Sequence, residues 1–135
     1  MAKHTIGVLV ENKPGVLTRV SGLFARRAFN IESLAVGPTE VDTVSRMTIV
    51  VSGDDHVLEQ IIKQLYKLID VIKVIDLSMT PAVHRELVLL RVSATSSNRS
   101  EIMQIVDIFR ARIVDVSDDS LIVEATGDES KVTAI

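Results

Sequence analysis

The turn Asn12-Lys13-Pro14-Gly15 is the stretch of this sequence best suited to hold a small charged molecule. Asparagine can fold its side chain onto nearby backbone, proline fixes φ, and glycine removes the steric penalty of a Cβ. Apolar residues at helical spacing follow: Val16, Leu17, Val20, Leu23 and Phe24. A helix that begins at about Gly15 leaves N–H groups unpaired in its first turn, where its dipole adds positive character. The pattern indicates a site for an anion such as a carboxylate, although an ordinary turn before a helix has the same signature.

Asn30 is a second polar candidate, because it stands among apolar residues at the entry of a strand-like stretch. In a side-by-side dimer, this strand could face the amino end of the first helix of another protomer. The alternative is an asparagine that satisfies only local backbone groups at the start of a strand.

Residue types that often catalyse reactions are present without the spacing that catalysis needs. His4, His56 and His84 have no histidine or acid nearby at zinc-ligand spacing, and we expect them at the surface. Helix capping and turn formation explain Asp54-Asp55 and Asp118-Asp119. No serine lies in a G-x-S-x-G elbow, and the glycines form no dinucleotide or P-loop signature. We predict no catalytic residue, no metal ligand and no cofactor in this chain.

Composition narrows the class of protein further. The 135 residues contain no cysteine, which excludes disulfides and thiolate metal sites. Residues 1–80 hold nine basic and nine acidic groups and residues 81–135 hold six and nine, so neither half has the basic excess that nucleic-acid binding needs. Four arginines could form a basic face, but a solvated surface is the preferred interpretation: Arg19, Arg26, Arg27 and Arg46. With no apolar run of about 20 residues and no signal-peptide pattern, we expect a cytoplasmic chain with no membrane partner.

The predicted elements have a regular order. In the first half we expect strands at 4–10, 29–36, 44–52 and 71–79, and helices from about 15 and over 57–69. The order β-α-β-β-α-β predicts an α+β, ferredoxin-like unit, with both helices on one face of a four-stranded antiparallel sheet.

The second half repeats this plan. We expect a strand at 86–94, a helix over 102–109, a hairpin of 113–116 with 121–126, and a helix beginning at 131–135. The last strand of the repeat is missing from the sequence. We therefore predict a first domain over residues 1–79 and a second, incomplete ferredoxin-like domain over residues 80–135.

The first half, over residues 3–79, closely resembles the ACT domain of the small, regulatory subunit of acetolactate (acetohydroxyacid) synthase. The resemblance lies in VLVENKPGVLTRVSGLFARRAFNIESLAV and in the following PTEVDTVSRMTIVVSGDDHVLEQIIKQLYKLIDVIKV. The second half, with RELVLLRV and EIMQIVDIFRARIVDV, is similar to that family's carboxy-terminal domain. The resemblance implies a non-catalytic chain that activates a separate large catalytic subunit and confers feedback inhibition by valine, sometimes by other branched-chain amino acids. Thiamine diphosphate, Mg and FAD would belong only to that large subunit.

In this family the effector lies between the ACT domains of a homodimer. By resemblance, one protomer holds its α-carboxylate and α-amino group with the turn and the helix start: Asn12, Pro14, Gly15, Val16 and Leu17. The opposing protomer would contribute Asn30 and Ile31. Ala28 stands where this family often has glycine, which predicts a slightly different turn into the second strand.

Three other classes of protein would explain parts of these patterns. One is an ACT-domain amino-acid sensor for another enzyme or a transcriptional regulator, although no DNA-binding helix pair is evident. Another is an acylphosphatase-like enzyme, which needs an arginine in the loop after the first strand, where this chain has only Lys13. The third is an RNA-recognition domain, but strands 6–10 and 44–52 carry no aromatic platform.

Overall fold

The computed structural model describes residues 2–135 as two compact units, the first ending at Ala82 and the second spanning Val83–Ile135. The first unit contains β1 (Lys3–Glu11), α1 (Val16–Arg26), β2 (Ile31–Pro38), β3 (Val44–Ser52), α2 (Asp55–Leu65) and β4 (Val71–Asp76). The second contains β5 (Glu86–Ser93), α3 (Arg99–Ile108), β6 (Arg112–Val116), β7 (Ser120–Gly127) and α4 (Glu129–Ala134). The predicted α+β class and order of elements are confirmed. We keep the predicted domain boundary between residues 79 and 80 as a proposal.

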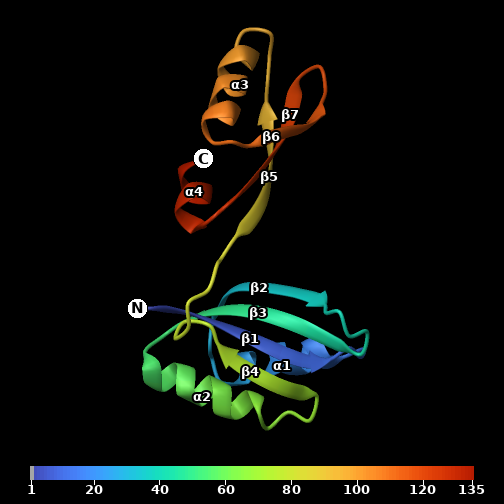
Figure 1. Cartoon of the computed structure of the whole chain (residues 1–135), viewed down its shortest axis with the longest axis vertical. Coiled ribbons are helices and arrows are strands. Elements are labelled where there is room, and N and C mark those ends of the chain that lie inside the picture. The colour runs from blue at the N-terminus through green and yellow to red at the C-terminus, as the bar shows by residue number, and fades with distance from the viewer. Residues whose placement is uncertain (1) are drawn as a thin grey trace. The chain divides into compact units, whose positions relative to one another are not determined.

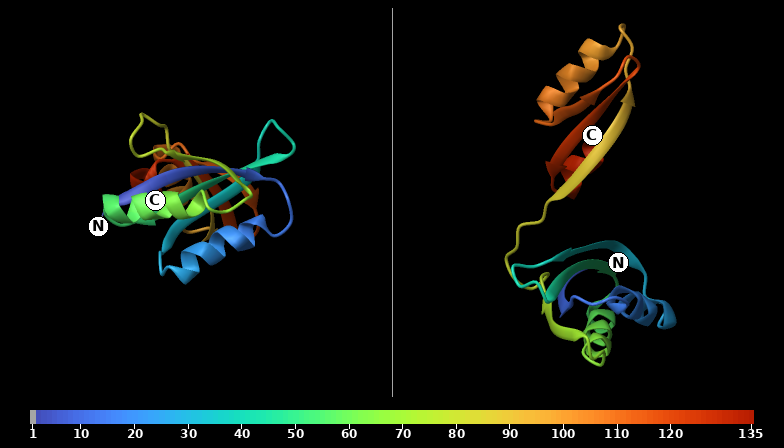
Figure 2. Two further views of the ribbon diagram at one scale, coloured as in Figure 1. Left: turned by 90° about the horizontal axis from the view of Figure 1, so that it is seen from below. Right: turned by 90° about the vertical axis from the view of Figure 1, so that its right-hand side faces the viewer.

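In the first unit, four strands form one antiparallel sheet in the order β2-β3-β1-β4. Each helix connects two strands that have a third strand between them, and right-handed crossovers of this kind put both helices on the same face. Figures 1 and 2 show α1 and α2 together on one face of the sheet. The predicted ferredoxin-like arrangement is confirmed.

The core of this unit lies between the sheet and its two helices. Alternate side chains of β1 and β3 face the helices, because successive residues of a strand point to opposite faces. The buried residues are Ile6, Val8, Val10, Val16, Val20, Leu23, Phe24, Met47, Ile49, Val51, Leu58, Ile61 and Leu65. Val16, in the first turn of α1, is only 3% exposed. The start of α1 is therefore fixed against the sheet.

The connection from α1 to β2 contains a strained residue. Phe29 N–H donates to the Phe24 carbonyl at 3.0 Å, which closes a Schellman motif, and Ala28 within it has a φ of 57°. Ala28 thus adopts the left-handed conformation that favours glycine. The rings of Phe24 and Phe29 pack edge to face, with centroids 6.4 Å apart. Phe29 lies in this connection, and β2 begins at Ile31 rather than at the predicted residue 29.

Two sequence expectations are wrong. His4 is buried, and its Nε2 atom lies 3.0 Å from the Gly53 carbonyl oxygen, because the pairing of β1 with β3 brings the two residues together. His56 and His84 are exposed as expected. The apolar spacing predicts that the second helix extends to Ile69, but α2 ends at Leu65 and Ile69 is 94% exposed.

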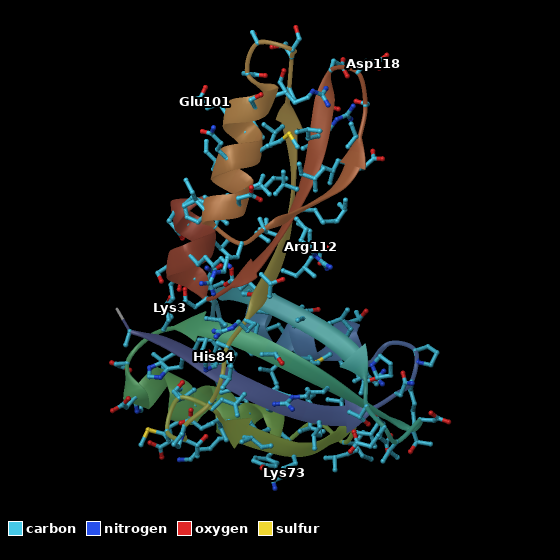
Figure 3. The ribbon with its side chains drawn as sticks, turned by 45° about the horizontal axis from the view of Figure 1, so that its top comes forward. Lys3, Lys73, His84, Glu101, Arg112 and Asp118 are labelled. Carbon is cyan, nitrogen blue, oxygen red and sulfur yellow. The ribbon has the colours of Figure 1, made fainter. Side chains whose placement is uncertain are left out.

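The second unit repeats the plan of the first over the described residues. Its sheet has the order β5-β7-β6, which matches β1-β3-β2 of the first unit. Arg110 has a φ of 53° after α3, as Ala28 has after α1. Asp128 caps α4 by accepting from the Lys131 N–H, as Asp54 caps α2. Figure 3 shows Asp118 at the tip of the β6–β7 hairpin, in the turn that the sequence predicts.

Candidate functional site

The predicted turn is tied to the loop before β3 through Asn12. Its N–H donates to the Thr43 carbonyl at 2.8 Å, and its side-chain Nδ2 donates to the Asp42 carbonyl at 3.0 Å. Both nitrogen atoms of Asn12 therefore donate a hydrogen bond within the chain. The Oδ1 atom of Asn12 has no partner in residues 2–135, and it remains available to accept a hydrogen bond.

Gly15 at the start of α1 has a φ of 86°, a left-handed conformation that disfavours any residue with a Cβ. The helix has no side-chain cap and no acidic residue in its first turn. The N–H of Val16 makes one long bond of 3.4 Å to the Lys13 carbonyl. Within residues 2–135, the N–H groups of Gly15, Leu17 and Thr18 have no partner. These donors and the helix dipole make the turn suitable for a carboxylate.

Two of the other described helices, α2 and α4, are capped by a side chain of the chain itself. Asp54 caps α2 by accepting from the Val57 N–H at 2.9 Å, and Asp55 adds an acid to that first turn. The first turn of α4 has Glu129 beside its Asp128 cap. α3 also lacks a side-chain cap but has Glu101 in its first turn, so among the described helices α1 is the one with neither a cap nor an acid there. The open start of α1 is thus a local feature of its sequence.

Two ion pairs surround the turn. Lys13 pairs with Glu11, whose hydrogen bond and negative charge raise the pKa of the Lys13 ammonium above its usual value. Arg19 pairs with Asp70 through Nε and Oδ2, at 2.6 Å. The spacing of Arg19 along the helix predicts a solvated position. Its partner Asp70 is 51 residues away in the sequence and comes close only in the folded chain. A single aspartate within the apolar stretch Leu68–Val74 was the available signal.

The remaining predicted residues have different placements. Pro14 and Leu17 are exposed, Leu17 by 45%, whereas Val16 lies in the core and can reach a ligand only through its backbone. Asn30 is exposed, and its Nδ2 lies 3.3 Å from Glu32 Oε1. Ile31 is half-buried beside the core.

One chain does not bring these two groups of residues together. Ile31 is opposite Val51 at the end of β3, whereas Glu11, just before the turn, is opposite Val44 at its start. Eight or nine residues of strand separate the two ends, or about 25 Å at 3.3 Å per residue. Asn30 and the turn therefore lie at opposite ends of the sheet.

Other kinds of site find no support in the described part of the chain. In residues 2–135 no cluster of three or more His, Cys, Asp or Glu side chains could hold a metal ion. No described helix is long and apolar enough to cross a membrane.

A βαββαβ unit with this open turn has the architecture of an ACT-type regulatory protein. The pattern of the AHAS small subunit-like ACT domain matches residues 6–73, and that of the small subunit of acetolactate synthase matches residues 85–135. The chain belongs to the acetolactate synthase small-subunit family, and its role is that of a regulatory subunit.

Individual relatives agree with this assignment. A probable acetolactate synthase small subunit of Archaeoglobus fulgidus is 66% identical over 132 residues, which are 98% of this chain and 82% of the relative. The acetolactate synthase small subunit of Mycobacterium leprae is 58% identical over 98% of this chain and 78% of its own length. The crystal structure of the small subunit from Thermotoga maritima superposes with a TM-score of 0.93 at 47% identity, covering 99% of this chain and 84% of that one.

Proposed function

We propose that this regulatory chain activates a separate catalytic large subunit and makes it sensitive to feedback inhibition by valine or another branched-chain amino acid. The observation that carries the proposal is the open start of α1, in a chain of the acetolactate synthase small-subunit family. The chain itself would hold no cofactor, and thiamine diphosphate, Mg and FAD would be bound by the large subunit alone. The complex would act in the cytoplasm on branched-chain amino acid biosynthesis.

A free amino acid matches the groups that the turn leaves unpaired. Its carboxylate would accept from the N–H groups of Gly15 and Leu17, and its ammonium would donate to Asn12 Oδ1. Its aliphatic side chain would pack on apolar residues such as the exposed Leu17. We retain Asn12, Pro14, Gly15, Val16 and Leu17 as the binding residues of one protomer.

A homodimer would complete the site. When an edge strand pairs antiparallel with its own copy, the start of one strand lies beside the end of the other. The end of β2, Pro38, is opposite Ser45 near the start of β3, which lies beside the turn. Such pairing of two β2 strands would bring Asn30 and Ile31 of one protomer to the turn of the other.

The outer edge of β2 is open to this pairing. It is an edge strand, and in residues 2–135 no hydrogen bond satisfies its outward backbone groups. Leu34 and Val36 are opposite the buried Ile49 and Met47, so they point to the helix-covered side, where they are 39% and 47% exposed. An apolar strip beside an unpaired edge is suited to burial against a second copy.

The other edge of the sheet is protected at one position. The hydroxyl of Tyr66 accepts from the Val74 N–H at 3.0 Å and lies 3.3 Å from the Val74 carbonyl oxygen. Both outward backbone groups of Val74, within β4, are thereby satisfied. This difference between the edges favours a closed pair through β2 over an open chain of units.

Valine would regulate by favouring one of two conformations that the dimer offers to the large subunit. This requires a different affinity for valine in each conformation, because a ligand that binds both equally shifts nothing. The coupling would also work in reverse, so the large subunit would change the affinity for valine.

Two measurements test the proposal. Calorimetry should show that the wild type binds valine and that Asn12→Ala binds it more weakly, because the substitution removes an acceptor for the ammonium. Activity of the large subunit, titrated with this chain, should rise without valine and fall when valine is added. Asn98→Ala, at the start of α3 in the second unit, is the matched control.

Unchanged affinity in Asn12→Ala would contradict the assignment of the site. A monomer at micromolar concentration, seen by sedimentation and still binding valine tightly, would contradict its location between two chains. If the chain binds valine but does not change the activity of the large subunit, it is an amino-acid sensor, and the proposed regulation of that subunit is wrong.

A further inference from the structure

Asp70 is the one buried carboxylate in residues 2–135 of this chain, and it lies next to the proposed effector site. Its side chain is only 8% exposed, and its carbonyl oxygen accepts from the N–H of Glu11, the residue before the turn, at 2.9 Å. Burying a carboxylate is unfavourable unless a partner compensates its charge. That partner is Arg19, whose Nε donates to Asp70 Oδ2 at 2.6 Å.

The pair leaves most of the guanidinium unused. Arginine has five N–H donors in a planar fork, and Asp70 takes the one on Nε. Neither Nη atom of Arg19 has a partner in the part of the chain that the structure describes. The Arg19 side chain is 49% exposed, so these four donors are accessible.

The unused donors lie over the turn. A Cβ placed on Gly15 would be 3.2 Å from Nη1 of Arg19 and 3.9 Å from Cζ. The guanidinium therefore lies beside the Gly15 backbone, where α1 also presents unpaired N–H groups. Lys13, the other cation of the turn, is already engaged by Glu11.

We propose that Arg19, held in place by Asp70, binds the α-carboxylate of the effector and makes the site specific for a free amino acid. Arginine suits this role, because its fork matches the two oxygens of a carboxylate. Asp70 is a positioning residue, since it contacts Arg19 and would not contact the ligand. The inference rests on the proposed function and identifies the chemical group that the site distinguishes.

The alternative is a purely structural ion pair that holds α1 against the segment before β4. Both roles predict that loss of Arg19 affects stability. They differ in ligand discrimination, because only a carboxylate-binding arginine makes the preference for valine over valinamide depend on residue 19.

The test is calorimetry of the intact chain with L-valine and L-valinamide at about pH 6.5, where the amino groups of both are mainly protonated. Four variants are needed: Arg19→Gln, Arg19→Lys, Asp70→Asn and the double variant Arg19→Gln/Asp70→Asn. Arg26→Gln is the matched control, because Arg26 lies exposed in the last turn of the same helix and forms no ion pair within residues 2–135. Circular dichroism and sedimentation establish that each variant is folded and keeps the assembly of the wild type.

The wild type should bind valine more tightly than valinamide. Arg19→Gln should weaken valine binding by about 10- to 100-fold, the effect of losing a charge-assisted hydrogen bond, and should barely change valinamide binding. Arg19→Lys should keep part of the preference, and Asp70→Asn should reduce it by misplacing an intact arginine. Arg26→Gln should match the wild type.

Each other outcome has a defined meaning. If the wild type prefers valine and folded Arg19 variants keep that preference, the backbone N–H groups recognise the carboxylate and the inference is overturned while the proposed function stands. If Arg19→Gln alone fails to fold, the double variant, which leaves no unpaired buried charge, decides between the roles. If the wild type binds neither ligand, valine is not the effector and the valine part of the proposed function fails.

Discussion

Replacement of Ala28 by glycine should stabilise the first unit, although it removes a side-chain methyl group. Ala28 has a φ of 57° at the end of α1, where the Schellman motif requires a left-handed residue. Its side chain is exposed, so little packing is lost. The substitution therefore tests backbone strain almost in isolation.

The magnitude follows from two opposing terms. An L-residue in the left-handed helical region costs about 1–2 kcal/mol that glycine avoids. Glycine gives the unfolded chain more freedom, which destabilises the folded state by about 0.4–1 kcal/mol. The net expectation for Ala28→Gly is a gain centred on about 0.8 kcal/mol, the middle of the range that the two terms allow, or roughly 3–6 °C in Tm for a unit of this size.

Thermal unfolding at one fixed protomer concentration measures the effect, because the stability of a dimer depends on concentration. Ala25→Gly is the matched control: Ala25 is exposed in the last turn of α1, where glycine should cost about 0.5–1 kcal/mol. The two variants should therefore shift Tm in opposite directions. A lower Tm for Ala28→Gly, or equal shifts for both variants, would refute the reasoning.

Three further outcomes are expected. Asp54→Ala should destabilise the first unit by about 1 kcal/mol in urea unfolding, because it removes the acceptor of the Val57 N–H. Tyr66→Phe should produce species larger than the wild-type assembly in sedimentation, because it frees both backbone groups of Val74 on the β4 edge. Hydrogen bonds from the Lys131 N–H and the Ser130 hydroxyl lower the pKa of Asp128 below its ordinary value. NMR should therefore show its cap on α4 intact at neutral pH and lost as the pH falls through that lowered pKa.

Each of these predictions has its own control. Asp55→Ala lies next to the cap and removes an acid without removing the capping bond, so it should cost less than Asp54→Ala. An unchanged sedimentation profile for Tyr66→Phe would show that the hydroxyl does not protect the edge. Asp128→Asn should abolish the pH dependence of α4, and persistence of that dependence would assign it to another group.

The fold was predictable because its signals are local. Alternation in β1 and β3 and the helical stripes of α1 and α2 each report which side chains face the core, and the order of the elements limits the topology. Ile69 shows that helical spacing alone does not locate the end of a helix. It continues the helical spacing of Leu65 by chance, because the chain makes a turn after α2 that has no distinctive residue pattern.

The contacts around the candidate site were less predictable, because they join residues far apart in the sequence. His4 is buried beside the carbonyl group of Gly53, which is 49 positions away in the sequence. A histidine at the start of a strand gives no indication of that partner. Arg19 likewise has the spacing of a solvated helix residue, and only the fold gives it Asp70. The sequence was sufficient to predict the turn. The ion pair of Arg19 with Asp70 beside the turn is evident only in the folded structure.

A site divided between two protomers, as proposed, would link effector binding to assembly. If the turn of one chain and Asn30 of another each supply part of the site, a monomer presents only half of the contacts, and valine must favour the dimer by its difference in affinity for the two states. Apparent affinity for valine should then rise with protomer concentration until the dimer is fully formed. Beyond that point, the effector can act on the large subunit only through a change within the dimer, and Arg19 and Asp70 lie at the junction of α1 with the segment before β4, where such a change could begin.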